Sequence, residues 1–474
     1  MSRQPNIILI MTDQQRYDSI AALGASYMHT PNLDRLAGEG VSFSQCHCTA
    51  AVCVPSRTSF FTMEYPHTVR SFENPSPWPG CWVEDLQAAG YHTVNVGKMH
   101  TVPMDGKFGF DQRFIVENKD RPLWLHLPHG AMLDEWDKFL LNSGVRKPSR
   151  AGYMADFPEW EWGLGAFEWP LEEQYHPDVF VGTMAEWFID KRESASPLFL
   201  QVGFPGPHPP YDPPARFLKL YEYADIPVPQ VTDEELAGQP PHHALQRQVM
   251  IDQNYDAVRW TERPSAEQLL RMRRHYAANV TLIDEQVGRI LAALERKGYL
   301  EDAIVVFMSD HGDCLGDHGH IQKWVLYDCI TRVPAIVWAP GRLPAGVEVG
   351  GLVQHMDLGP MLFELAGLPV RQHSGAQSAL PVARGEQPGR DAVFCELRAS
   401  TNVRQLTMVR THEWKLVHYL DHPEWGELYD LAGDPGELRN LWHDAAHQET
   451  KQALLDALLN WHIRQPLGLE KVVR

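Results

Sequence analysis

The chain has 474 residues, of which 44% are hydrophobic and 22% are charged, so it is not a disordered, collagen-like or coiled-coil protein. Its 42 Lys and Arg residues against 61 Asp and Glu residues give a net charge of -19, which argues against a nucleic-acid partner or an anionic membrane as partner. An anionic substrate would therefore have to meet a local cluster of positive charge.

The N-terminal residues do not have the pattern of a targeting segment. The apolar run from Ile7 to Met11 is short, and no small-residue cleavage site follows it. No stretch reaches the roughly 18 apolar residues of a membrane helix. The seven cysteines are an odd number in a chain large enough to fold without disulfides, which favours reduced thiols and a cytoplasmic location.

Short apolar runs alternate with helical segments along most of the chain. The patterns predict strands over residues 6–11, 91–96, 197–204, 303–308 and 335–338, and helices over 30–37, 83–89 and 271–297. This alternation predicts an α/β fold with a large, mostly parallel sheet sandwiched by helices. Residues from about 115 to 175 and from about 205 to 265 show no clean period, and we expect long functional loops with short helices over one rim of the sheet.

The hydrophobic pattern of the sequence changes after about residue 385, where short strand-like runs follow one another. We predict paired strands over 406–410 and 414–419, a further segment over 428–431, and a final helix over 448–463. The expected organisation is a catalytic α/β domain over residues 1–385 and a small antiparallel α+β domain over 386–474.

Polar side chains gather where the predicted strands end, and the carboxyl ends of strands form the ligand crevice in open α/β sheets. They are Asp13 and Gln14, Lys98 and His100, His208, and Asp310 and His311. Oxygen and imidazole ligands at two of these ends predict a divalent metal ion such as Ca²⁺, Mg²⁺ or Mn²⁺. The alternative is that Asp13 and Asp310 only cap the helices that follow.

The segment Cys53-Val54-Pro55-Ser56-Arg57, at the start of a probable helix, resembles the signature of the type I, formylglycine-dependent sulfatases of the alkaline phosphatase-like superfamily. In that family the cysteine is oxidised after translation to an aldehyde. The aldehyde hydrates, and one of its hydroxyls attacks the sulfur of a sulfate ester.

The resemblance extends over nearly the whole chain through a series of motifs in order. They are the first strand with Asp13-Gln14, Gly97-Lys98-Met99-His100, Pro207-His208-Pro209, Ser309 to Gly319 with Lys323, and the C-terminal Glu427 to Leu431. Many members have two aspartates in place of Asp13-Gln14 and Asp-Asn in place of Asp310-His311. The Gln and His forms are similar to the choline-sulfatase and phosphonate-monoester-hydrolase branches, and the choline-sulfatase-like branch is the nearest in site pattern.

The resemblance implies a role for each site residue. The metal ligands would be Asp13, Gln14, Asp310, His311 and residue 53. Ca²⁺ is the expected ion, and Mn²⁺ is next because the neutral ligands Gln14 and His311 weaken the preference for Ca²⁺. Asp310 would accept the nucleophile's proton, and Arg57 would hold the hydrated aldehyde. Lys98 and Lys323 would bind the sulfate oxygens. His208, together with Lys323, would protonate the departing alcohol, and His100 would take the proton of the second hydroxyl. Asn74 matches a substrate-contacting asparagine of the choline-sulfatase-like branch.

The resemblance also implies partners, and it leaves alternatives open. The substrate would be a small-molecule sulfate ester, the transient partner would be a formylglycine-generating maturation enzyme, and a homo-oligomer stays open. One alternative is a phosphonate monoester or phosphodiester hydrolase with the same nucleophile, although that branch has Tyr and Thr in place of Lys98 and His100. A second is a non-catalytic binding protein. The tryptophans 124, 136, 160, 162 and 169 form either a cage for the organic half of the substrate or buried packing, and we favour packing.

Overall fold

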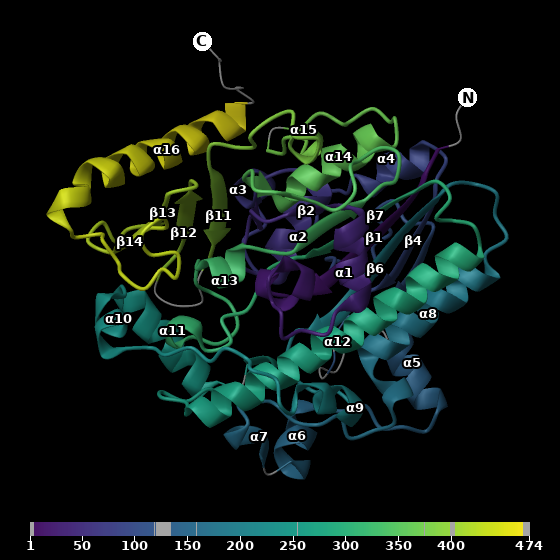
Figure 1. The fold of residues 1–474 in the computed structure, drawn as a ribbon, viewed down its shortest axis with the longest axis horizontal. Helices are drawn as coiled ribbons and strands as arrows, with labels where there is room; N and C mark the ends of the chain where they lie inside the picture. The colour runs from purple at the N-terminus through teal and green to yellow at the C-terminus, as the bar shows by residue number, and fades with distance from the viewer. Residues whose placement is uncertain are drawn as a thin grey trace.

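A central eight-stranded sheet organises the molecule, as seen in a computed structural model that describes residues 4–117, 119, 134–157, 159–253, 255–373, 375–398 and 403–467 (Figure 1). In spatial order its strands are β5 (Gln112–Ile115), β4 (His92–Gly97), β6 (Leu198–Pro207), β1 (Asn6–Asp13), β7 (Ala303–Ser309), β8 (Ala335–Trp338), β2 (Val41–Phe43) and β9 (Val347–Val349). The five strands from β5 to β7 run parallel to one another, β8 is antiparallel to both β7 and β2, and β2 is parallel to β9. The predicted mostly parallel sheet is confirmed.

The first strand shows why the sheet is covered on both faces. All eight residues of β1 are buried, as expected for a strand inside a parallel sheet. Successive side chains point to opposite faces. Ile8 and Ile10 belong to one hydrophobic core, whereas Ile7 and Leu9 belong to another. The first core includes residues of α1, α8 and α12, and the second includes residues of α2, α4 and α14, so two helical layers sandwich the sheet (Figure 1).

The helices of this part of the chain fall into a few long ones and many short ones. They are α1 (Pro31–Glu39), α2 (Cys53–Thr62), α3 (Pro66–Val69), α4 (Val83–Ala88), α5 (Glu135–Asn142), α6 (Arg150–Asp156), α7 (Glu159–Trp162), α8 (Pro177–Lys191), α9 (Ala215–Leu218), α10 (Asp233–Gly238), α11 (Pro241–Asp252), α12 (Ala266–Arg296), α13 (Asp328–Thr331), α14 (Leu358–Leu365) and α15 (Leu380–Ala383). Helix α12 begins five residues earlier than predicted, because Ser265 and Gln268 form a capping box at its start.

The two segments without clean periodicity contain short helices, as predicted, and their tryptophans pack. Trp136, Trp160 and Trp169 are buried, and their indole N–H groups donate to the backbone carbonyls of Tyr175, Ala257 and Glu172. Trp162 is 43% exposed, under the guanidinium of Arg271. Trp124 lies outside the described residues. The packing interpretation is therefore confirmed for three of the five indoles.

A separate four-stranded antiparallel sheet follows near the C-terminus. Its strands are β11 (Val393–Leu397), β12 (Leu406–Arg410), β13 (Trp414–Tyr419) and β14 (Gly426–Asp430), and α16 (Gln448–Leu467) packs on β12 and β13. All of these elements lie after residue 385, and we propose the domain boundary there on that basis. None of the helices in the described ranges is both long and apolar enough to cross a membrane.

Several short strands were absent from the sequence prediction. They are β2, β5, β9, β11 and the two-stranded pair β3 (Cys46–His47) and β10 (Val353–Gln354). Strands of two to five residues carry too few side chains for an alternating pattern, so their existence depends on the neighbour that they pair with.

Candidate active site

The polar strand ends predicted from the sequence meet at one edge of the sheet. Because β4, β6, β1 and β7 are adjacent and parallel, their carboxyl ends bring together Lys98, His208, Asp13 and Asp310. Backbone hydrogen bonds fix this edge, since the N–H of Lys98 donates to the carbonyl of Gly203 at 2.7 Å and that of His208 donates to the carbonyl of Asp13 at 3.1 Å. A Cβ at Gly203 would collide with the Lys98 carbonyl, so glycine is required there for this approach.

Cys53 is the first residue of α2, and the whole helix is buried. The hydroxyl of Ser56 donates to the backbone carbonyl of Asp310 at 2.6 Å, which docks the helix against the end of β7. The side-chain oxygen of Asn74 accepts the Val54 N–H at 2.9 Å, which is one of the groups that a helix start leaves unpaired. The cysteine therefore stands at a fixed helix N-terminus, and Asn74 lies beside it.

The predicted metal ligands surround Cys53. Single ligand atoms of Asp13, Cys53, Asp310 and His311 all lie within 4.8 Å of one another, and the four residues are fully buried. The Cys53 sulfur is 3.2 Å from His311 Nε2 and 3.6 Å from Asp13 Oδ1. Two carboxylates and an imidazole at this spacing fit a divalent ion.

Gln14, the remaining predicted ligand, presents its amide oxygen to the same space. Its backbone lies in the left-handed region (φ 67°), which is uncommon for a residue with a side chain. Its Oε1 accepts from Lys323 Nζ at 2.8 Å, and Lys323 Nζ is 3.3 Å from the Cys53 sulfur. Its Nε2 donates to Asp313 at 2.7 Å, which fixes which end of the amide faces the site.

Three buried cations stand among these ligands and form the positive cluster that an anionic substrate needs. Arg57 Nε donates to Asp310 Oδ2 at 2.7 Å, and its Nη2 lies 3.3 Å from Asp13 Oδ2. Lys98 Nζ lies 2.7 Å from the same Asp13 oxygen. Lys323 is the third. Lys323 faces Cys53 and Gln14, so three positive charges lie around Cys53 in a chain whose net charge is -19.

The charges shift the pKa values of the site in opposite directions. Burial opposes the charged form of Asp13, but Lys98 and the other cations around it outweigh burial and hold its pKa well below the usual value. Burial and Asp13 raise the pKa of the Cys53 thiol, whereas Lys323 and His311 lower it, and the net pKa falls below that of an ordinary cysteine. Burial lowers the pKa of His311, but Asp310 and Cys53 raise it to about 9.

The two remaining predicted histidines lie at the rim of this cluster. His208, directly after β6, has an 11% exposed side chain, and its Nε2 lies 3.4 Å from Asp256 Oδ2. His100, just after β4, donates its backbone N–H to both carboxylate oxygens of Glu117 at 3.1 Å. The roles of both imidazole rings stay predictions.

Three acidic residues of the site were missed by sequence reasoning. Asp256 pairs with His208, Glu117 holds the backbone of His100, and Asp313 accepts from Gln14 and from the Tyr211 hydroxyl at 2.8 Å. Burial raises the pKa of Glu117, against the influence of Lys98. Asp313 lies inside the motif from Ser309 to Gly319, so the sequence could have identified it as a site residue. Asp256 and Glu117 lie in segments that have no regular hydrophobic period, and no sequence signal marks them.

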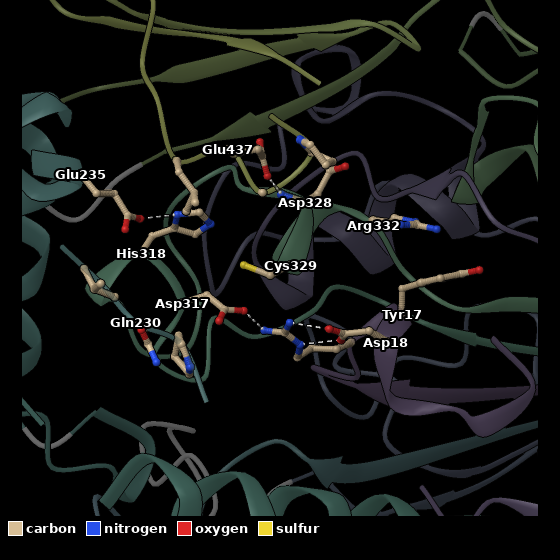
Figure 2. Close-up of a pocket in the computed structure, with 16 residues that line it drawn as sticks. Tyr17, Asp18, Gln230, Glu235, Asp317, His318, Asp328, Cys329, Arg332 and Glu437 are labelled. Atoms are coloured by element: carbon tan, nitrogen blue, oxygen red, sulfur yellow. Dashed lines mark hydrogen bonds and ion pairs between the residues drawn. The ribbon is translucent and has the colours of Figure 1, made fainter. Parts of the chain in front are cut away.

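A cavity of about 430 Å³ lies between the loop after β1 and the segment that follows β14 (Figure 2). No predicted site residue lines it. Several of its charged groups pair with one another, since Arg16 pairs with Asp18 and Asp317, and His318 pairs with Glu235 (Figure 2). We therefore place the candidate active site at Cys53.

Comparisons with known proteins identify what the chain as a whole is similar to. The family profile described as Sulfatase matches residues 5–368, and the profile described as N-sulphoglucosamine sulphohydrolase, C-terminal, matches residues 316–464. A choline-sulfatase of Rhizobium meliloti (strain 1021) is 30% identical over 451 residues, covering 92% of this chain and 82% of that protein. An arylsulfatase of Clostridium perfringens is 27% identical over 469 residues, covering 94% and 92%. The crystal structure of a phosphonate monoester hydrolase of Agrobacterium radiobacter is similar with a TM-score of 0.80 and 25% identity, covering 98% of this chain and 96% of that one.

Proposed function

Since this chain belongs to the sulfatase family and is a sulfuric ester hydrolase, we propose that it cleaves a sulfate monoester with a formylglycine derived from Cys53 and a divalent metal ion. The observation that carries the proposal is the position of Cys53, whose sulfur lies within 3.6 Å of a carboxylate, an imidazole and an ammonium group. Together they supply metal ligands and sulfate-binding charge at one nucleophile.

Asp13, Gln14, Asp310 and His311, with the modified residue 53, would hold the metal. A bound divalent ion supplies Lewis-acid charge for the sulfate oxygens and helps to orient the ester. We propose Ca²⁺ first because oxygen ligands predominate, and Mn²⁺ next because one ligand is an imidazole. Arg57 offsets the mutual repulsion of the two carboxylates through its contacts with both.

During the attack on sulfur, some residues act on the nucleophile and others act on the leaving group. A hydrated aldehyde at position 53 supplies two hydroxyls on one carbon. Asp310, anchored by Arg57 and by the N–H groups of Gln14 and His311, accepts the proton that the attacking hydroxyl loses. Lys98 and Lys323 stabilise the charge on the sulfate oxygens. As the bond from sulfur to the alcohol oxygen breaks, His208 gives its proton to that oxygen, and Lys323 assists.

Release of sulfate restores the aldehyde, and addition of one water to it regenerates the hydrated form. His100 takes the proton of the second hydroxyl, the carbonyl bond reforms, and the bond between that carbon and the sulfate oxygen breaks. No water has to attack sulfur by this route, which explains why an aldehyde serves here and a serine would not. Arg57 holds the oxygen atoms at residue 53 during both steps.

A phosphonate monoester hydrolase is the second candidate, because a protein of that name shares the fold over 98% of this chain. The test is to compare kcat/KM for an aryl sulfate and an aryl phosphonate monoester, using protein produced with a maturation enzyme and a Cys53→Ala control. We expect the sulfate to be the better substrate, Cys53→Ala to be inactive, and peptide mass spectrometry to find formylglycine at position 53. Active protein with an unmodified cysteine would contradict the mechanism, and a preference for the phosphonate would favour the rival.

The alcohol half of the substrate remains to be assigned by experiment. The similarity to a choline-sulfatase supports choline sulfate as the first compound to test. Aryl sulfates and sulfated sugars complete the panel.

The cellular setting is also a proposal. We propose a cytoplasmic enzyme, supported by seven cysteines of which none forms a disulfide. Its transient partner would be a formylglycine-generating enzyme that reaches Cys53 before folding completes, because that residue is 1% exposed in the folded chain. Homo-oligomerisation stays open.

A further inference from the structure

A second group of metal-type ligands lies where the C-terminal helix packs against the N-terminal part of the chain. It consists of His67 on α3, Glu396 on β11 and His462 on α16, and one ligand atom of each lies within 4.8 Å of the others. Among the residues that the structure describes, only this group and the one around Cys53 combine at least three such side chains at this spacing.

The three side chains are held in place by their surroundings. Glu396 is buried, and its Oε2 lies 2.8 Å from His67 Nδ1 and accepts the His67 backbone N–H at 3.1 Å. The His67 ring stacks on Tyr65 and meets Trp461 edge-on, with ring centroids 5.9 and 4.8 Å apart. The ring of His462 is 5.0 Å from that of His67. The group is thus assembled before any ligand arrives.

The two ring nitrogens of His67 differ in their contacts. Its Nδ1 faces the Glu396 carboxylate, whereas its Nε2 is buried and has no hydrogen-bond partner within the described ranges. A buried polar atom without a partner is costly and rare. Because Nδ1 is the nitrogen beside the carboxylate, an ion held by both His67 and Glu396 would bind to Nδ1.

We propose that His67, Glu396 and His462 form a binding site for Zn²⁺. Two imidazoles and a carboxylate are a donor set that zinc accepts, with water in the fourth position. The set differs from the oxygen-rich group around Cys53, so the two sites would select different ions. Zinc binding requires neutral imidazoles and releases any proton that either ring carries.

The site would connect distant parts of the fold. Helix α3 follows α2, the helix that begins with Cys53, and α16 belongs to the C-terminal part of the chain. An ion shared by His67 and His462 would fasten α16 to the end of the nucleophile-bearing segment. Zinc should therefore raise the thermal stability of the full-length protein.

The test measures zinc stoichiometry in a chain whose other metal group has been disabled. In the full-length Asp13→Ala/Cys53→Ala variant, stripped with a chelator and reloaded with Zn²⁺, we expect one equivalent of zinc. Adding His462→Asn should remove that equivalent, whereas adding His443→Asn, at an exposed histidine of the same region, should retain it. Co²⁺ loaded in the same way should give the visible spectrum of a four-coordinate ion, which His462→Asn abolishes.

A second measurement covers the case in which the double variant does not fold. Zn²⁺ should raise the Tm of the chelator-treated wild-type protein and of His443→Asn, and the rise should be smaller in His462→Asn. Zinc stoichiometry or a zinc-dependent Tm that His462→Asn leaves unchanged would overturn the proposal. Both readouts report binding rather than turnover, so they are independent of whether the chain hydrolyses sulfate esters.

Discussion

Replacing His208 should separate the treatment of the leaving group from the treatment of sulfate. The His208 backbone is tied to the carbonyl of Asp13 at 3.1 Å, and its ring Nε2 lies 3.4 Å from the carboxylate of Asp256. The imidazole thus lies beside the predicted metal ligands and has a carboxylate as its partner. A group that protonates the departing alcohol needs such a position and such a partner. An alkyl alcohol needs that proton early, whereas a nitrophenolate leaves without it.

The expected size follows from the usual contribution of a positioned general acid. Such a group contributes about 10²- to 10⁴-fold, equivalent to roughly 3–5 kcal/mol of activation free energy. His208→Ala should therefore reduce kcat/KM for an alkyl sulfate by that factor and for a nitrophenyl sulfate by far less. Lys98→Ala removes a charge that serves the sulfate oxygens of both esters, so its two losses should be similar, about 10²- to 10³-fold.

The assay measures kcat/KM for both variants on both substrates. A third variant, Asp256→Asn, tests the contact between Asp256 and His208, which the sequence did not predict. Because Asp256 acts through His208, its variant should also slow the alkyl ester more than the nitrophenyl ester, with a smaller effect than His208→Ala. Equal losses in all four combinations of the two main variants and two substrates would refute the assignment of His208 and make the Pro207-His208-Pro209 loop structural.

Three further perturbations test the site and the packing around it. Asp13→Ala should remove one equivalent of bound metal and abolish turnover, because it deletes one of two carboxylate ligands, and elemental analysis with full metal content would contradict this. Asn74→Ala should cost about 1 kcal/mol of unfolding free energy in thermal or urea denaturation, because the Val54 N–H loses its acceptor, and an unchanged midpoint would argue against that contact. Glu427→Gln should cost roughly 3 kcal/mol at neutral pH, because burial opposes the carboxylate but His243 and two tyrosine hydroxyls lower its pKa from 4.5 to about 2. Because the pKa of Glu427 is lower in the folded state than in the unfolded state, the carboxylate stabilises the fold above about pH 4.5, and this contribution is lost as the pH falls toward 2. The difference in unfolding free energy between wild type and Glu427→Gln, measured by urea denaturation, should therefore narrow below about pH 4.5. A difference that does not change with pH would exclude this cause.

The sequence by itself determined the fold class and the identity of the chemistry. The apolar run that ends at Asp13 predicts a buried parallel strand because every one of its residues must avoid water, whichever strands flank it. The segment from Cys53 to Arg57 indicates sulfatase chemistry through its resemblance to the signature of that family, and its two defining residues lie one helical turn apart on α2. Such patterns are local, so neighbouring residues suffice to specify them.

The tertiary structure alone decided which distant groups touch. Lys323 meets Gln14 across 309 positions of the chain, and His208 meets Asp256, a residue in a segment without any regular pattern. The pairing of the short strands at the sheet edge and the proximity of His67 to His462 are also contacts between residues that lie far apart in the chain. Each of these contacts depends on how layers of helices and strands pack, and the free energy that fixes it comes from burial of residues elsewhere in the chain, so no local pattern encodes it.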